Sequence, residues 1–243
     1  MGHRVTTLNV NTIEPAGNTL TIGASGDTVV LADDVKSNTY KDAGGNTLFV
    51  SNGSGVLSSV NSGFGDSLKL LSTQTASSSA SISFTSGLDS TYKEYIFKFV
   101  NIHPATDATD FKFQVNAVGA SGYDETMTTT FFRADHDEAD SQAYLQYYVH
   151  GDQAQGTDFQ YIGIGCGNDN DLSSHGELHL FNPASTTYVK NFYATMVIGM
   201  GGGWARELFI AGYINTALAI DDIQFKMTAG NIDAGTIKMY GVL

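Results

Sequence analysis

An alternation of apolar and polar residues with a period of two runs through residues 92–243. In Phe111-Lys-Phe-Gln-Val115, the two Phe and the Val share one phase, while Lys112 and Gln114 share the other. Successive side chains of a β-strand point to opposite faces, so this spacing predicts strands with one buried and one exposed face. The alternation therefore favours an all-β fold over this region.

About ten segments repeat the pattern, with turn-like stretches rich in Gly, Asn and Ser between them. Many short strands at regular spacing are typical of an antiparallel β-sandwich, so we predict a jelly-roll-like sandwich over residues 91–243. A short helix is expected only at Asp135–Gln146. The predicted strands are Tyr95–Val100, Phe111–Val115, Thr129–Arg133, Tyr144–Val149, Phe159–Ile164, Glu177–Phe181, Tyr188–Ile198, Glu207–Ile214, Ile223–Met227 and Ile237–Tyr240.

The N-terminal region has a different character. A Gly-Asn-Thr-Leu start at Gly17 returns at Gly45, and each copy reads as a β-run, a turn rich in Gly, Ser and Asn, and a second β-run. Such turns suit hairpins, but a lone hairpin is marginal in water. We predict that residues 1–65 form an extended β-hairpin strip that needs partner chains, hence a homotrimer; a flexible linker is the alternative.

A Ser-rich stretch separates these two regions. Serine accounts for 14 of the 40 residues from 51 to 90. We predict that residues 66–90 form a connector between the strip and the sandwich.

Charge and cysteine content exclude several classes of protein. The chain has 25 acidic residues against 12 Lys and Arg, a net charge of −13. Binding of a nucleic-acid backbone or an anionic membrane requires a basic face, so neither partner is expected. The start of the chain has no apolar signal-peptide core, and no apolar run approaches a membrane span, so we expect synthesis in the cytoplasm and no membrane insertion. The single Cys166 cannot form an intrachain disulfide.

One spacing resembles a metal site. His175, Glu177 and His179 lie two residues apart, which places them on one face of a strand, as in cupin-type ligand sets for zinc, iron or nickel. A cupin-like site also needs a His on a neighbouring strand, and a solvated strand face has the same pattern. We therefore predict no metal and no cofactor.

Other chemistry is equally weakly marked. The acidic segments 135–140 and 167–171 offer oxygen ligands for calcium, but neither follows the order of an EF-hand loop, and ordinary turns use the same residues. Cys166 lies between glycines at a strand end, which favours a buried, inert thiol. No Gly-x-Ser-x-Gly motif occurs. We predict no catalytic residues and no enzymatic activity.

Aromatic and amide side chains on predicted loops are the best binding candidates. The chain's single Trp follows a glycine-rich run, Gly199-Met-Gly-Gly-Gly-Trp204, and exposed aromatic residues on loops contact sugar rings or proteins. The alternative is that this Trp folds back onto the sandwich. The candidate surface-binding residues are Tyr144, Tyr147, Tyr148, Asn168, Asp169 and Trp204.

Three segments carry a resemblance to a known group of proteins. They are residues 11–30, which begin Asn-Thr-Ile-Glu-Pro, residues 88–107, which include Lys-Glu-Tyr-Ile-Phe-Lys-Phe-Val, and residues 214–241. The chain resembles fibre-like structural proteins of tailed phages, especially those of marine bacteria. This resemblance implies a virion component, commonly homotrimeric, with its N-terminal part attached to other virion proteins and its C-terminal β domain facing outward. It carries no catalytic residues over to this chain.

The expected function is therefore a trimeric tail fibre or fibre-like appendage whose β domain binds a host-surface glycan or protein. The alternative is a capsid decoration (cement) protein on the outer surface of the head. A cupin-like metal enzyme or a glycan depolymerase is a third possibility. Copy number per particle discriminates between the first two.

Overall fold

The computed structural model describes residues 39–58, 60 and 67–243, and the chain divides into two compact units, 1–64 and 65–243. All regular structure in the described residues is strand, which confirms the all-β prediction. In strand β7 (Thr109–Ala117) the predicted apolar phase is buried, at Phe111, Phe113 and Val115. The other phase is less exposed than predicted, since Lys112 is half-buried and Gln114 is buried.

The N-terminal unit contains a small antiparallel sheet in the order β1-β2-β3, formed by Thr39–Lys41, Thr47–Ser51 and Leu57–Ser58. The ring of Tyr40 stacks on that of Phe49, 4.5 Å away. Asn52 closes the turn between β2 and β3, because its Oδ1 accepts hydrogen bonds from two backbone amides ahead of it. The second repeat copy is thus a strand, a turn and a strand, as predicted; the first copy lies outside the described residues.

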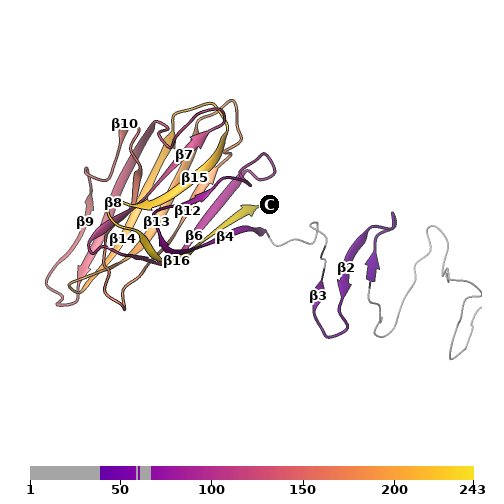
Figure 1. Cartoon of the computed structure of the whole chain (residues 1–243), viewed down its shortest axis with the longest axis horizontal. Helices are drawn as coiled ribbons and strands as arrows, with labels where there is room; N and C mark the ends of the chain where they lie inside the picture. The colour runs from indigo at the N-terminus through magenta and orange to yellow at the C-terminus, as the bar shows by residue number, and fades with distance from the viewer. Residues whose placement is uncertain (1–38, 59, 61–66) are drawn as a thin grey trace, which may run out of the picture. The chain divides into compact units, whose positions relative to one another are not determined.

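The C-terminal unit contains two antiparallel sheets (Figure 1). The larger sheet has the order β10-β8-β14-β13-β12-β6-β16-β4, with β9 also paired to β8, and the smaller has the order β11-β7-β15-β5. All ten predicted strands form. The strands are β4 Leu68–Ser79, β5 Ile82–Phe84, β6 Glu94–Pro104, β7 Thr109–Ala117, β8 Met127–Asp137, β9 Ala143–Tyr147, β10 Ala154–Gly156, β11 Gln160–Cys166, β12 Ser174–Phe181, β13 Lys190–Met200, β14 Trp204–Ile214, β15 Ile220–Met227 and β16 Ile232–Val242.

Four nested strand pairs define the topology. Strand β4 pairs with β16, β5 with β15, β6 with β12, and β7 with β11, and successive pairs alternate between the two sheets. This nesting of early with late strands is the jelly-roll arrangement of a two-sheet sandwich. Two insertions, β8–β10 and β13–β14, extend the larger sheet beyond β12.

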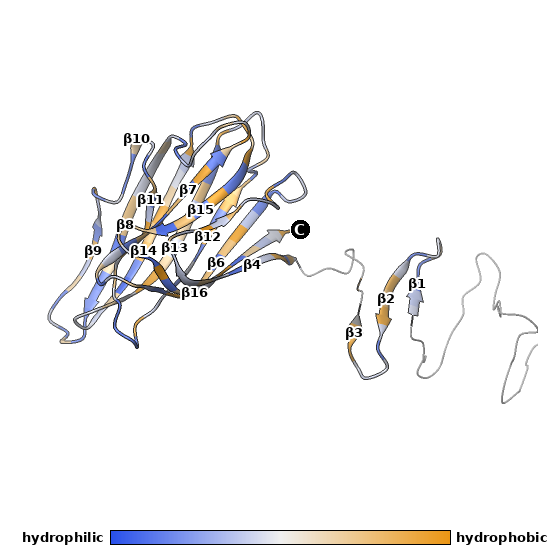
Figure 2. Ribbon diagram, in the orientation of Figure 1, coloured by the Kyte–Doolittle hydropathy of each residue, from blue (hydrophilic) through white to orange (hydrophobic). Residues whose placement is uncertain are grey.

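Phenylalanine side chains join the two sheets through one core. Phe225 of the smaller sheet lies within 5.5 Å, between ring centroids, of Phe97 and within 5.2 Å of Phe99, both in the larger sheet. Phe113 meets Phe192 in the same way at 5.0 Å. Figure 2 shows the apolar residues that recur along β6 and β7. Fully burying a Phe stabilises a fold by about 1.5–3 kcal/mol, so this aromatic layer is a main source of stability.

The Ser-rich segment 66–90 is not a connector. Most of residues 68–84 form β4 and β5, which pair with β16 and β15, so the sandwich begins near Leu68. Strand β4 lies at the edge of the larger sheet; three of its first four residues are Leu, and residues 72–79 are Ser, Thr or Gln apart from Ala76. The apolar alternation that identifies the other strands is therefore missing from residues 72–79.

The predicted helix at Asp135–Gln146 is wrong. Strand β8 continues to Asp137, a turn follows, and β9 returns antiparallel to it. The Asp137 carboxylate accepts hydrogen bonds from the backbone N–H groups of Ser141 and Gln142 at 2.8 and 2.9 Å. Local side-chain hydrogen bonding of this kind competes with helix formation and closes the turn.

Candidate binding sites

The strand registers place six turns at one end of the sandwich. Ser79 pairs with Ile232, which pairs with Pro104, and Met200 pairs with Trp204, which pairs with Asp137. The chain enters the sandwich at Leu68, which lies at the opposite end because it pairs with Val242. We call the first end the loop end; its turns span residues 80–81, 105–108, 138–142, 167–173, 201–203 and 228–231.

Two predicted aromatic residues meet at the loop end. Trp204 is the first residue of β14, and its ring lies 5.9 Å from that of Tyr144 on β9. Tyr144 is 39% exposed, and its hydroxyl donates to Gln142 Oε1 at 3.1 Å. Trp204 is half-buried, so it neither projects freely from a loop nor plugs the core. The pair presents a partly exposed aromatic surface.

The Asn168–Asp169 loop lies at this same end. The backbone N–H of Asn168 approaches Asp107 Oδ1 at 3.3 Å, and that of Gly167 donates to Gly199 O at 2.8 Å. These bonds tie the β11–β12 loop to both the β6–β7 loop and the β13–β14 hairpin. The fold therefore brings four of the six predicted surface-binding residues to one end of the sandwich: Tyr144, Asn168, Asp169 and Trp204.

The other two predicted residues diverge from this group. Tyr147 is opposite Phe132 on the outer face of the larger sheet, and its hydroxyl lies 2.5 Å from Asp152 Oδ2, a hydrogen bond that raises the pKa of Tyr147. Tyr148 is half-buried and packs on Phe131, while the Arg133 guanidinium lies 4.6 Å from its ring centre. The six candidates thus do not form one site.

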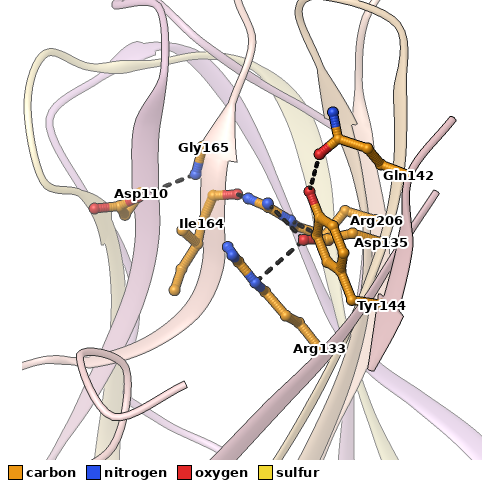
Figure 3. A network of polar contacts seen from close by, with 8 residues as sticks. All are labelled: Asp110, Arg133, Asp135, Gln142, Tyr144, Ile164, Gly165 and Arg206. Carbon is orange, nitrogen blue, oxygen red and sulfur yellow. Dashed lines mark hydrogen bonds and ion pairs between the residues drawn. The ribbon is translucent and has the colours of Figure 1, made fainter. Parts of the chain in front are cut away.

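A buried network of ion pairs and hydrogen bonds lies close to the loop end, between the two sheets (Figure 3). Arg206 donates to both carboxylate oxygens of Asp135, at 2.6 and 3.0 Å, and to the carbonyl of Ile164 on β11 at 3.3 Å. Arg133 Nε lies 3.2 Å from the same carboxylate. The network links β8 and β14 of the larger sheet to β11 of the smaller one. Trp204 lies on β14, and Tyr144 lies on β9, which pairs with β8.

The predicted His175, Glu177 and His179 do share one face of β12, but they do not converge. His179 Nδ1 lies 2.6 Å from Glu94 Oε1, and its Nε2 lies 3.1 Å from Glu177 Oε1. His175 instead contacts the Ser173 hydroxyl at 3.0 Å. Among residues 39–58, 60 and 67–243, no group of three or more His, Cys, Asp or Glu is placed to hold a metal ion.

Two further predictions on chemistry concern Cys166 and the acidic segments. Cys166 is fully buried, as predicted, and burial raises the pKa of its thiol to about 11. In segment 135–140, the carboxylates of Asp135 and Asp137 are already engaged by Arg206 and by the β8–β9 turn. That segment is therefore an ordinary strand end and turn.

A hollow on the outer face of the larger sheet is a site that the sequence analysis missed. It has a volume of about 510 Å³ and lies over β8, β14, β13 and the end of β12. In the sequence, the hollow is marked by aromatic residues at the outward-facing positions of their strands, Phe181, Tyr193 and Tyr213, which alternate with the buried positions. The lining residues are Thr128, Thr129, Thr130, Phe181, Asn191, Phe192, Tyr193, Ala211, Gly212 and Tyr213.

Comparison of this chain with protein-family models, with curated proteins and with solved structures finds no match. Within the described ranges, no helix has the length and apolar character needed to cross a membrane.

Proposed function

We propose that this chain is a non-enzymatic structural protein of a tailed-phage virion, a trimeric fibre-like appendage whose jelly roll contacts the host surface. Residues 1–65 attach it to other virion proteins, and the loop end of the sandwich faces the host. Tyr144, Asn168, Asp169 and Trp204 form the contact surface.

One observation carries this proposal: the chain enters the sandwich at Leu68, at the end opposite the six turns. A domain tethered at one end presents its other end farthest from the point of attachment. Binding residues are often found on loops that a rigid scaffold positions, and here the scaffold includes the Arg206–Asp135 network. The resemblance of residues 11–30 and 88–107 to phage fibre-like proteins supports the same arrangement.

A non-enzymatic role is supported by the state of the reactive groups. The thiol of Cys166 is buried, and the imidazole of His179 is held between two carboxylates. Neither is placed to act on an external substrate, because both are engaged or enclosed by the fold itself.

Quantitative mass spectrometry of purified phage particles tests the position in the virion. A copy number of a few per cent of the major capsid protein or less supports an appendage. A ratio between one to one and one to a few identifies a head decoration protein instead and overturns the fibre proposal. Sedimentation of the purified chain tests the oligomeric state: a trimer is expected, and a monomer contradicts it.

Competition of the purified protein with phage adsorption tests the contact surface. The wild-type protein is expected to slow adsorption, and the double variant Tyr144→Ala/Trp204→Ala is expected to lose this effect. The matched control is Tyr188→Ala, an exposed tyrosine that follows β12 at the opposite end of the sandwich. Equal competition by the double variant and the wild type would remove these residues from the contact surface.

A further inference from the structure

The hollow on the outer face exists because a small side chain stands among large ones. Ala211 on β14 is exposed, and its cross-strand neighbours are Thr130 on β8 and Tyr193 on β13. Tyr213 lies two residues along the same strand, on the same face of the sheet. Tyr193 and Tyr213 therefore form the sides of a depression, and the methyl group of Ala211 forms its floor.

The tyrosine wall is held in place from behind. The ring of Tyr193 stacks on His179 at 4.3 Å with an angle of 14° between the planes, and Phe181 lies 5.9 Å from Tyr193. His179 is fixed in turn by Glu94 at 2.6 Å. Tyr193 is nevertheless 40% exposed, so a preformed aromatic face remains open to a ligand.

Polar groups stand at the rim. Asn191 is exposed on β13, opposite Tyr213, and its carboxamide makes no hydrogen bond within the part of the chain that the structure describes. On the opposite side, Gln155 Nε2 donates to Thr128 Oγ1 at 2.6 Å, and its Oε1 accepts from Asn215 at 2.8 Å. Amide and hydroxyl groups thus border an aromatic floor and wall.

The absence of charged side chains from the lining restricts which ligands the hollow can bind. The ten lining residues are all uncharged, although the chain has a net charge of −13. A cation would find no carboxylate in the lining, and an anion would be repelled by the protein as a whole. An uncharged ligand with both apolar faces and hydroxyl groups fits these surroundings best.

We propose that this hollow is a carbohydrate-binding site for an uncharged pyranose unit of a glycan. The apolar face of the sugar ring packs on Tyr193 or Tyr213, and the hydroxyl groups of the sugar form hydrogen bonds with Asn191 and Thr128. Aromatic packing with a few placed polar groups is the usual construction of such ligand sites. The site lies away from the loop end, so it does not depend on the position of the protein in a virion.

Binding of neutral oligosaccharides to the full chain tests this proposal. The probes are gluco-, galacto- and manno-hexaoses, titrated by calorimetry, with polygalacturonate as an acidic comparison. At least one neutral probe is expected to bind, with polygalacturonate bound more weakly. Two variants remove the site in different ways: Tyr213→Ala removes a wall, and Ala211→Trp fills the floor.

Both variants are expected to weaken binding about tenfold or more, whereas Tyr188→Ala leaves it unchanged. Because Ala211 is exposed, its replacement keeps the proposal testable if Tyr213→Ala folds poorly. Failure of all three neutral probes to bind, or equal affinity in both variants, would overturn the proposal. Self-association that Ala211→Trp abolishes, without sugar binding, would also overturn it, since the hollow would then be a contact between copies.

Discussion

Arg206 and Asp135 lie directly opposite each other on β14 and β8, and the guanidinium grips both oxygens of a carboxylate whose side chain is 1% exposed. A two-point ion pair in this position fixes the orientation of both strands. Arg133 is a second partner of this carboxylate, so removing the charge of Asp135 leaves two guanidinium groups without their counter-charge, which is the costly way to break such a network.

Asp135→Asn is therefore expected to lower the free energy of unfolding by about 3–5 kcal/mol. Urea denaturation followed by circular dichroism measures this change. The matched control is Lys98→Met, which breaks the exposed 3.5 Å ion pair with Glu177 and is expected to cost about 0–1 kcal/mol. Similar losses in the two variants would contradict the structural role given to the buried pair.

Gly176 occupies a position on β12 that admits no side chain. A Cβ there would meet the carbonyl oxygen of Thr195 and the sulfur of Met196 on β13. Gly176→Ala is expected to destabilise the sandwich by about 1–3 kcal/mol, because the two strands must separate. In Gly201→Ala the nearest atom is 4.0 Å away, so thermal denaturation should show a clear fall in Tm only for the first variant. A wild-type Tm in Gly176→Ala would refute this close packing.

Cys166 is expected to be unreactive while the protein is folded. Burial raises the pKa of its thiol to about 11, so only about one molecule in a thousand is a thiolate at pH 8. A thiol reagent such as DTNB should label the native protein negligibly and the urea-unfolded protein with one equivalent, since the chain has one Cys. Rapid labelling of the native protein would show that the thiol is accessible.

Acid should destabilise the protein partly through Asp137. Hydrogen bonds from the Ser141 side chain and from the backbone of Gln142 and Ser141 hold the pKa of Asp137 below its ordinary value. A lowered folded-state pKa adds stability above the unfolded-state pKa, and this contribution is lost as the pH falls through the folded value.

Asp137→Asn should therefore lose less stability than the wild type between pH 5 and pH 2, as measured by urea midpoints at each pH. Asp171→Asn, an exposed residue on the β11–β12 loop, is the control and should follow the wild type. Parallel pH curves for Asp137→Asn and wild type would assign the acid sensitivity to other groups.

The sequence predicted those parts of the fold in which one strand face is apolar. The ten segments with a clear alternation all form strands. Burial of side chains such as Phe97, Phe113 and Phe225 stabilises the strand register that points the apolar residues into the core. The prediction failed where a strand has few apolar residues, as in residues 72–79 of β4. At 135–146, turn closure by Asp137 outweighed what resembled a helix start.

The binding surfaces were predicted less completely, for a geometric reason. Asn168, Asp169, Tyr144 and Trp204 share one end because the nested registers bring their turns together, which loop composition could only suggest. The outer hollow combines side chains from four strands that are distant in sequence, such as Phe181 and Tyr213. Only strand order places them side by side, and strand order cannot be read from alternation.

The pairing of β4 with β16 also has a consequence for how the protein is made. It joins groups such as Ser78 and Asp233, which are 155 positions apart, so β4 leaves the ribosome long before β16, its neighbour in the sheet, exists. Contacts of this sequence separation form slowly, because a long loop must close first. The nested pairs are expected to assemble from the innermost, β7 with β11, outward. Until residues 232–242 are released, β4 stays unpaired, and the nascent sandwich depends on cellular chaperones or on its own polar serines and threonines to avoid aggregation.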